Sequence, residues 1–94
     1  MSAERITVGQ IVISAAGRDM GKTYIVMEKL APPFVLVANG LDRKVASPKR
    51  KNIRHVTIHS SIAEAVAEKI ARCAKVTDED IRQALNQVCT MDDK

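Results

Sequence analysis

The residues with the clearest potential for chemistry lie in AGRDMGKT, residues 16–23. This stretch fits the relaxed phosphate-loop pattern A-x-x-x-x-G-K-T, in which Ala16 replaces the glycine of the strict pattern. In such a loop the backbone amides surround nucleotide phosphates and a lysine, here Lys22, neutralises their charge. Nucleotide binding is therefore the first hypothesis that the sequence raises.

A phosphate loop must connect a strand to a helix, because amides at the helix N-terminus point at the phosphates. The upstream QIVIS is typical of a strand, but the downstream TYIVMEKL is rich in β-branched residues and ends at Pro32-Pro33. No apolar run ends in an aspartate that could hold magnesium. The sequence therefore favours a turn between two antiparallel strands, and nucleotide binding is kept only as a remote alternative.

In that turn, Gly17 and Gly21 would supply backbone angles or close approaches that side chains disfavour. Arg18 and Lys22 would face solvent, where they either bind a phosphate or only solvate the turn. The rest of the sequence favours binding, because six further cations lie within twelve residues that contain no acid: Arg43, Lys44, Lys49, Arg50, Lys51 and Arg54. Arginine binds phosphate bidentately and lysine binds it as a point charge. The alternative is a basic loop that only keeps the protein soluble.

The charge is unevenly distributed along the chain. Residues 1–60 carry ten Lys and Arg against four acids, whereas residues 61–94 carry five against seven. This asymmetry predicts a polyanionic partner for the first part alone. Only Tyr24 and Phe34 are aromatic, and Phe34 is expected in the core. Recognition by base stacking is therefore disfavoured, and structured RNA recognised through phosphates, 2′-hydroxyls and shape is favoured.

Other chemistry is not predicted. His55 and His59 would lie about 13 Å apart along a strand, too far to share a metal ion, and His55 is instead assigned to RNA contact beside Arg54. Cys73 and Cys89 lack zinc-site spacing and are expected to be reduced thiols that pack as small apolar groups. We therefore expect no enzyme activity, no cofactor and no metal. With no signal peptide or membrane-spanning run in the sequence, the expected location is the cytoplasm.

The sequence changes character near Ser60. Before it, short β-branched runs separated by turn residues predict a small antiparallel β domain, and Asn39-Gly40 predicts a tight hairpin between FVLVA and a strand containing RKVAS. The basic KRKN segment is expected to be a connector, and IRHVTIH the last strand. The predicted division is a β domain at residues 1–59 and a helical extension at residues 60–94.

Two helices are predicted in the extension. Ser61 and Glu64 have the spacing of a capping box, and an apolar stripe follows at Ile62, Val66, Ile70 and Cys73. A second helix is expected to start at Thr77, followed by three acids in its first turn and the apolar face Ile81, Leu85 and Val88. The two helices are expected to form a hairpin packed on the β domain or on a partner.

The segment VGQIVISAAGRDMGKTYIVMEKL resembles a KOW motif, the signature of small SH3-like barrels in ribosomal proteins and transcription-elongation factors. The matching positions are Gly9, Ile11, Ile13, Gly17, Gly21, Lys22 and Val26, and the resemblance covers about residues 6–59. The whole chain is similar to small bacterial KOW-domain RNA-binding proteins, which are related to a KOW-type protein of archaeal and eukaryotic large ribosomal subunits. Met20 and Tyr24 depart from the broader pattern.

The resemblance implies a mainly β fold with an α appendage, in the form of a five-stranded SH3-like barrel followed by a helical hairpin. The implied function is non-enzymatic binding of structured RNA, ribosomal RNA above all, with association to a ribosomal subunit. An SH3-like protein-interaction module, with a protein partner on the helices, is the alternative. The RNA-binding residues predicted from charge are Arg18, Lys22, Arg43, Lys44, Lys49, Arg50, Lys51, Arg54 and His55.

Overall fold

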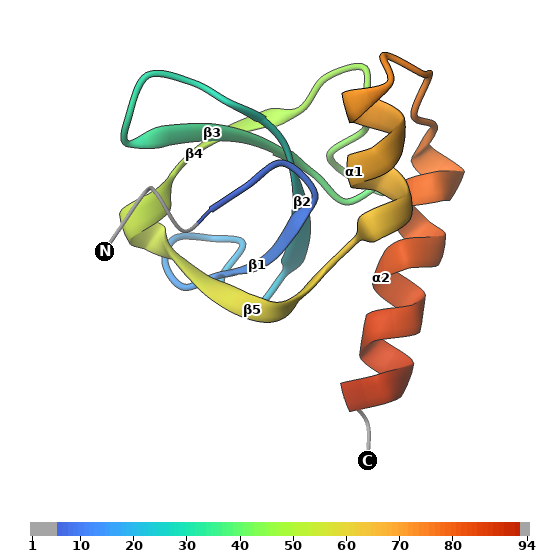
Figure 1. The fold of residues 1–94 in the computed structure, drawn as a ribbon. Coiled ribbons are helices and arrows are strands. Elements are labelled where there is room, and N and C mark those ends of the chain that lie inside the picture. The colour runs from blue at the N-terminus through green and yellow to red at the C-terminus, as the bar shows by residue number, and fades with distance from the viewer. Residues whose placement is uncertain (1–5, 93–94) are drawn as a thin grey trace.

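The computed structural model describes residues 6–92, with side chains up to residue 87, as a five-stranded antiparallel sheet followed by two helices (Figure 1). The elements in chain order are β1 Gln10–Ser14, β2 Thr23–Lys29, β3 Phe34–Ala38, β4 Lys49–Asn52, the 3₁₀ helix η2 Ile53–His55, β5 Val56–Ile62, α1 Glu64–Ala71 and α2 Asp78–Asp92.

The strands are arranged in the order β4-β3-β2-β1-β5, and every neighbouring pair is antiparallel. The sheet curls so that β5, which follows η2, lies beside β1 (Figure 1). No ladder among the described residues joins the edge strands β4 and β5. The mainly β fold with a helical appendage is thus confirmed, whereas the described sheet is open and does not show a closed SH3-like barrel.

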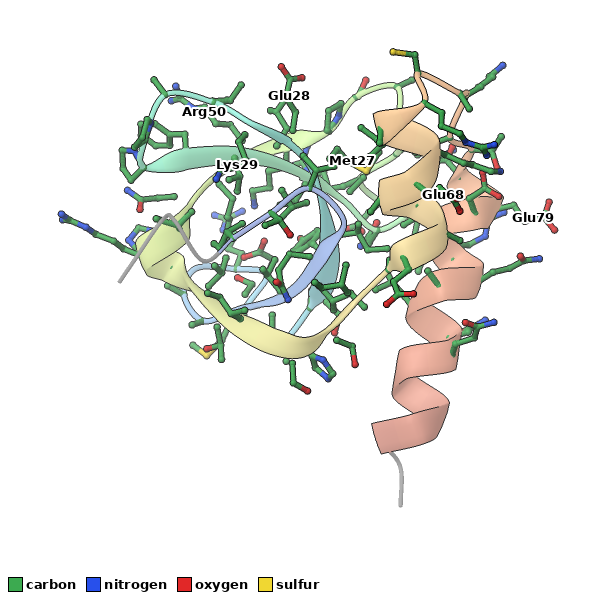
Figure 2. The ribbon with its side chains drawn as sticks, viewed as in Figure 1. Met27, Glu28, Lys29, Arg50, Glu68 and Glu79 are labelled. Atoms are coloured by element: carbon green, nitrogen blue, oxygen red, sulfur yellow. The ribbon has the colours of Figure 1, made fainter. Side chains whose placement is uncertain are left out.

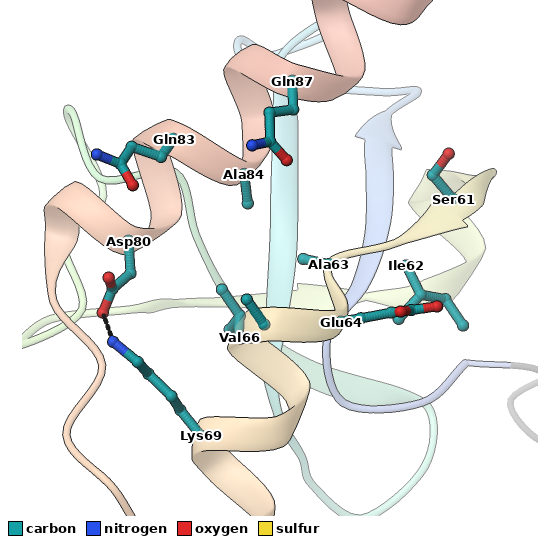
Figure 3. A pocket seen from close by; sticks show the side chains of 11 residues that line it. Ser61, Ile62, Ala63, Glu64, Val66, Lys69, Asp80, Gln83, Ala84 and Gln87 are labelled. Atoms are coloured by element: carbon teal, nitrogen blue, oxygen red, sulfur yellow. Dashed lines mark hydrogen bonds and ion pairs between the residues drawn. The ribbon is translucent and has the colours of Figure 1, made fainter.

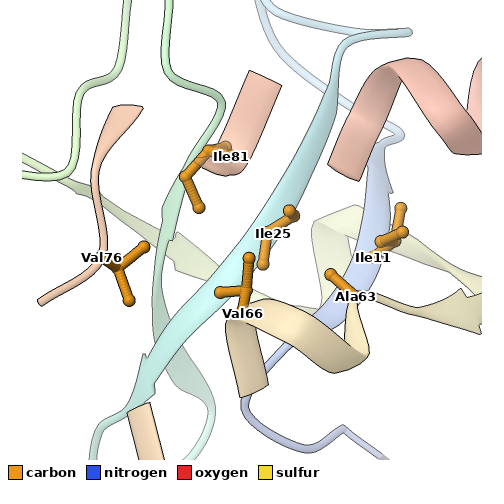
Figure 4. Close-up of a cluster of buried hydrophobic side chains, with 6 residues drawn as sticks. All are labelled: Ile11, Ile25, Ala63, Val66, Val76 and Ile81. Atoms are coloured by element: carbon orange, nitrogen blue, oxygen red, sulfur yellow. The ribbon is translucent and has the colours of Figure 1, made fainter. Parts of the chain in front are cut away.

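The central strands are buried on both faces because each face has its own apolar cover. One face curls around Val12, Tyr24, Val26, Val35 and Val37, together with Ile6. The other face presents Ile11 and Ile25 to the helical segment, where Ala63, Val66, Val76 and Ile81 complete a second core (Figure 4). This double burial explains why the strand runs are almost continuously apolar instead of alternating. Each fully buried Ile or Val contributes about 1.5–3 kcal/mol.

The second helix begins where the sequence predicts. The Asp80 amide donates to Thr77 Oγ1 at 3.1 Å and the Thr77 amide donates to Asp80 Oδ2 at 3.0 Å, so the two residues cap the helix reciprocally. Ile81 is fully buried and Leu85 packs against the second core. Val88 and Cys89 lie beyond the residues whose side chains are described.

The predicted start of the first helix is wrong. Ser61 belongs to β5, which continues until Ile62 pairs with Gln10, and α1 has Ala63 as its N-cap without a side-chain hydrogen bond. Pairing with β1 therefore overrides the capping signal. Ile62 is 45% exposed in the strand, and Cys73 is exposed with a φ of 58°, so neither extends the predicted apolar stripe.

The predicted hairpin at Asn39-Gly40 is also wrong. Asn39 Oδ1 accepts hydrogen bonds from the amides of Leu41, at 2.9 Å, and Arg43, at 3.0 Å, and this closes a local turn. Residues 39–48 form a loop, and the strand that pairs with β3 is the KRKN segment. This loop lies against α2, because Arg82 Nη1 donates to the Gly40 carbonyl at 2.7 Å and the Val45 amide donates to Asp78 Oδ1 at 2.7 Å.

Candidate nucleic-acid interface

The segment AGRDMGKT forms a turn between two paired strands. Ile13 of β1 lies opposite Thr23 of β2, and the strand conformation continues to Lys29, so no helix follows the loop. Gly17 and Gly21 have φ values of +85° and +92°. The predicted strand–turn–strand arrangement is confirmed, and the helix N-terminus that a phosphate loop requires is replaced by β2.

The turn encloses a buried carboxylate to which the sequence analysis assigned no role. Asp19 is 7% exposed and accepts four side-chain donors. Ser14 Oγ and Tyr24 Oη each lie 2.8 Å from it, Lys51 Nζ lies at 3.0 Å and Lys49 Nζ at 3.1 Å. A carboxylate so enclosed by donors ties the β1–β2 loop to both β1 and β4. The only sequence signal for it is an isolated acid within a basic half of the chain.

The protonation of this cluster follows from its contacts. Burial raises the pKa of the Asp19 carboxyl, but hydrogen bonds from Lys51, Ser14, Tyr24 and Lys49 outweigh burial and hold the pKa well below its usual range. Burial, followed by the bond to Asp19, raises the pKa of the Tyr24 hydroxyl above its usual value. At neutral pH the cluster therefore contains one carboxylate, a neutral tyrosine and two lysines.

The basic triplet of β4 is divided between two faces, because successive strand residues point in opposite directions. Lys49 and Lys51 point inward to Asp19, and Lys51 is only 7% exposed. Arg50 points outward and holds its guanidinium 4.5 Å from the centre of the Phe34 ring. Phe34, which was expected in the core, is therefore partly exposed and covered by an arginine. The three cations do not form one patch.

A second basic group lies on the β3–β4 loop beside the end of the turn. Lys22 Nζ contacts Asp42 Oδ2 at 2.6 Å, and both side chains are about half exposed, at 48% and 52%. Asn39 Nδ2 donates to Asp42 Oδ1 at 2.7 Å. The hydrogen bond from Lys22, with that from Asn39, lowers the pKa of Asp42 to about 2. Arg43 and Lys44 follow in the same loop and are exposed.

The third group is brought to the turn by η2. The Ala15 amide donates to the His55 carbonyl at 2.8 Å, which places Arg54 and His55 beside the start of the turn that carries Arg18. Arg18, Arg54 and His55 are exposed. Among the described residues, Arg18, Arg43, Lys44 and Arg54 form no ion pair with a carboxylate. We call these four residues the unpaired cations.

The helices carry a different surface. A groove of about 510 Å³ lies between the end of β5, α1 and α2, with Ile62, Ala63, Val66 and Ala84 among its apolar lining residues (Figure 3). Lys69 Nζ and Asp80 Oδ2 pair across it at 2.9 Å. Within residues 6–87, no group of three or more His, Cys, Asp or Glu side chains could hold a metal ion. No helix in the described range is long and apolar enough to cross a membrane.

The comparisons with known proteins find similarity to large-subunit ribosomal proteins. No family model matches the sequence. The chain is 28% identical over 87 residues to the large ribosomal subunit protein eL14 of Hyperthermus butylicus, an alignment that covers 93% of this chain and 82% of that protein. It is 27% identical over 82 residues to eL14 of Sulfolobus acidocaldarius, covering 87% and 78% respectively.

These similarities refine the resemblance seen in the sequence. They support a relationship to the KOW-containing ribosomal proteins, and they extend from the sheet into the helices because they span most of the chain. Both relatives are archaeal, so the bacterial part of the resemblance is not supported.

Proposed function

We propose that this protein binds structured ribosomal RNA in the large ribosomal subunit and catalyses no reaction. The observation that carries the proposal is the set of unpaired cations, Arg18, Arg43, Lys44 and Arg54, which are exposed on loops that the fold anchors. An exposed cation without a carboxylate partner is available to neutralise an RNA phosphate, which releases cations condensed on the RNA. The similarity to eL14 supports the ribosomal assignment, which implies a cytoplasmic location.

The buried cluster supplies the scaffold for this interface. Asp19 ties the turn that carries Arg18 to β4, and η2 then continues directly from β4 to Arg54. Two lysines face a single carboxylate, so the cluster retains one positive charge beneath the turn, and Lys49 remains 30% exposed there. We assign Lys51 to this scaffold instead of to the RNA. His55 and Arg50 remain proposed contacts at the margins of the interface.

The finer fold assignment is also part of the proposal. The curled order of five strands, with η2 linking the last two, supports an open variant of the SH3-like KOW barrel at residues 1–59. The helices α1 and α2, which follow the end of β5 at Ile62, then form an extension that packs on the outside of the sheet through the second core. Its surplus of acids makes the extension a weaker RNA-binding surface than the sheet, and a protein neighbour could contact its exposed face.

The interface is tested by removing unpaired cations in pairs. Arg18→Ala with Arg54→Ala, and Arg43→Ala with Lys44→Ala, should each weaken binding to fragments of large-subunit RNA about tenfold or more near 0.1 M salt, because each pair removes two phosphate contacts. The matched control is Arg72→Ala with Lys75→Ala, two exposed cations of the helical half. Filter binding or fluorescence anisotropy measures the affinities. Equal losses in all three variants would overturn the interface.

A further inference from the structure

A hollow of about 500 Å³ lies where the end of the β1–β2 turn, the β3–β4 loop and α2 meet. This volume is within the range of about 300–1,000 Å³ that is usual for sites of small ligands. Leu41 forms one apolar wall and Leu85 of α2 another. Lys22, Asp42, Arg82 and Asn86 provide polar groups around them. The hollow is therefore apolar in its walls, and its rim carries two cations and one carboxylate.

The exposed wall is held in place by the backbone of its loop. Leu41 is 63% exposed, yet its amide donates to Asn39 Oδ1 at 2.9 Å. The neighbouring Gly40 carbonyl accepts from Arg82 Nη1 at 2.7 Å, which fixes the loop against α2. The loop that presents this apolar side chain to solvent is anchored on two sides. A ligand that contacts Leu41 would therefore not have to pay the entropic cost of ordering the loop.

The polar groups retain capacity for a ligand. Lys22 directs one donor to Asp42 and has two more N–H groups. The Asn86 carboxamide is exposed and makes no hydrogen bond within the described part of the chain, so it offers both a donor and an acceptor. A carboxamide of this kind matches the edge of a nucleobase, which also presents donors and acceptors side by side.

We propose that this hollow receives one unpaired nucleobase of the bound RNA, with the faces of the base against Leu41 and Leu85 and its edge at Asn86. The proposal rests on the proposed function. The adjoining Arg43 and Lys44 are unpaired cations on the same loop, so the nucleotide's phosphate would meet a positive rim. That rim favours a nucleotide over a peptide side chain, because a peptide carries no obligatory negative charge. Packing against leucines supplies contact that the two aromatic residues cannot provide here: Tyr24 is buried and Phe34 is covered by Arg50.

The test compares two RNA hairpins that are identical except for a single bulged 2-aminopurine in one stem. The wild-type protein should bind the bulged hairpin about fivefold more tightly or better, because the base and the two leucines bury apolar surface against each other. The fluorescence of the bulged base should change on binding, because the base leaves solvent. Leu41→Ala should abolish the preference and the fluorescence change while leaving the affinity for the paired hairpin within about twofold.

A matched control uses Met20, which is exposed to a similar extent, at 65%, on the β1–β2 turn and does not line the hollow. Met20→Ala should retain the preference for the bulge, and Asn86→Ala should reduce it. Equal binding of both hairpins by the wild type would overturn the base site and leave the proposed function standing. Binding of neither hairpin, nor of ribosomal RNA fragments, would overturn both. A preference that survives Leu41→Ala would overturn the site and assign the hollow to a protein neighbour.

Discussion

At the residue scale, Asp19 determines which lysines of β4 point into the fold. Its carboxylate accepts from Ser14, Tyr24, Lys49 and Lys51, so two of the cations proposed to bind RNA also form part of the buried scaffold. Removing a buried lysine takes a charge-assisted hydrogen bond from this carboxylate, which is more costly than losing an exposed contact. The adjacent positions 50 and 51 of β4 should therefore respond very differently to the same substitution.

Lys51→Ala should lower the free energy of unfolding by about 1.5–3 kcal/mol, because Asp19 would lose its most buried charged hydrogen-bond donor while Lys49 still compensates its charge. Arg50→Ala, one residue away, should cost about 1 kcal/mol or less, the value of an exposed cation–π contact. Urea denaturation followed by circular dichroism measures both. Equal losses at the two positions would show that the Asp19 cluster does not stabilise the fold.

The same cluster predicts an acid dependence. The folded pKa of Asp19 is lowered, so its contribution to stability is fully present above the unfolded pKa of about 3.9 and is lost as pH falls toward the folded pKa. The stability difference between the wild type and Asp19→Asn should therefore be largest near neutral pH and shrink below about pH 4. Denaturation at a series of pH values measures it. A difference that is constant down to pH 2 would contradict the role of the ionised carboxylate.

At the scale of elements, the parts set by local signals could be predicted and those set by long-range contacts could not. The strands β1 to β3, the glycine turn and the Thr77 start of α2 follow from runs of β-branched residues, from glycine and from capping. The strand KRKN could not be predicted, because its composition is that of a connector. It is a strand because β3 pairs with it. Its inward lysines contact Asp19, which lies 30 residues away in sequence from Lys49.

The general chemistry of the candidate site could be predicted from the sequence, but the set of residues that form it could not. A basic first half of the chain favoured RNA, and Arg18, Arg43, Lys44 and Arg54 are indeed exposed. Which lysines point inward depends on the alternation of side chains along β4 and on the buried Asp19. Neither can be predicted from local charge density. The hollow beside Leu41 depends on the contact of the β3–β4 loop with α2, which joins residues 42 positions apart.

That contact depends on a glycine. Gly40 has a φ of +77°, and a Cβ atom there would lie 2.6 Å from the Asp78 carbonyl oxygen and 2.9 Å from Arg82 Cγ. Gly40→Ala should therefore push the β3–β4 loop away from α2 and lower the free energy of unfolding by about 1–3 kcal/mol. Gly21→Ala is the control, because it shares the positive φ but has open space around it and should cost less. Thermal unfolding compares the two variants, and an equal loss would show that backbone strain alone explains the cost.

At the scale of the whole molecule, two acids of the helices lie apart from the outward cation of β4. Figure 2 shows Glu68 and Glu79 on the helices, away from Arg50 on the sheet, where Glu28 also lies. In 0.15 M salt the Debye length is about 8 Å, so exposed charges farther than this from the bound RNA are largely screened from it. The position of a charge should therefore matter more than the net charge of +4.

This separation makes a final prediction possible. Glu68→Lys with Glu79→Lys raises the net charge of the helices by four and should change RNA affinity by about twofold or less in 0.15 M salt. Asp42→Asn raises the net charge by only one, but it releases Lys22 while keeping the oxygen that accepts from Asn39, so it should raise affinity about threefold or more. Anisotropy titrations at several salt concentrations measure both. If the helix variant bound RNA more tightly than Asp42→Asn at 0.15 M salt, the net charge of the protein, and not the position of its cations, would govern binding. A steeper salt dependence for Asp42→Asn alone would show that Lys22 had gained a phosphate contact, because each such contact steepens the slope by about 0.7–0.9.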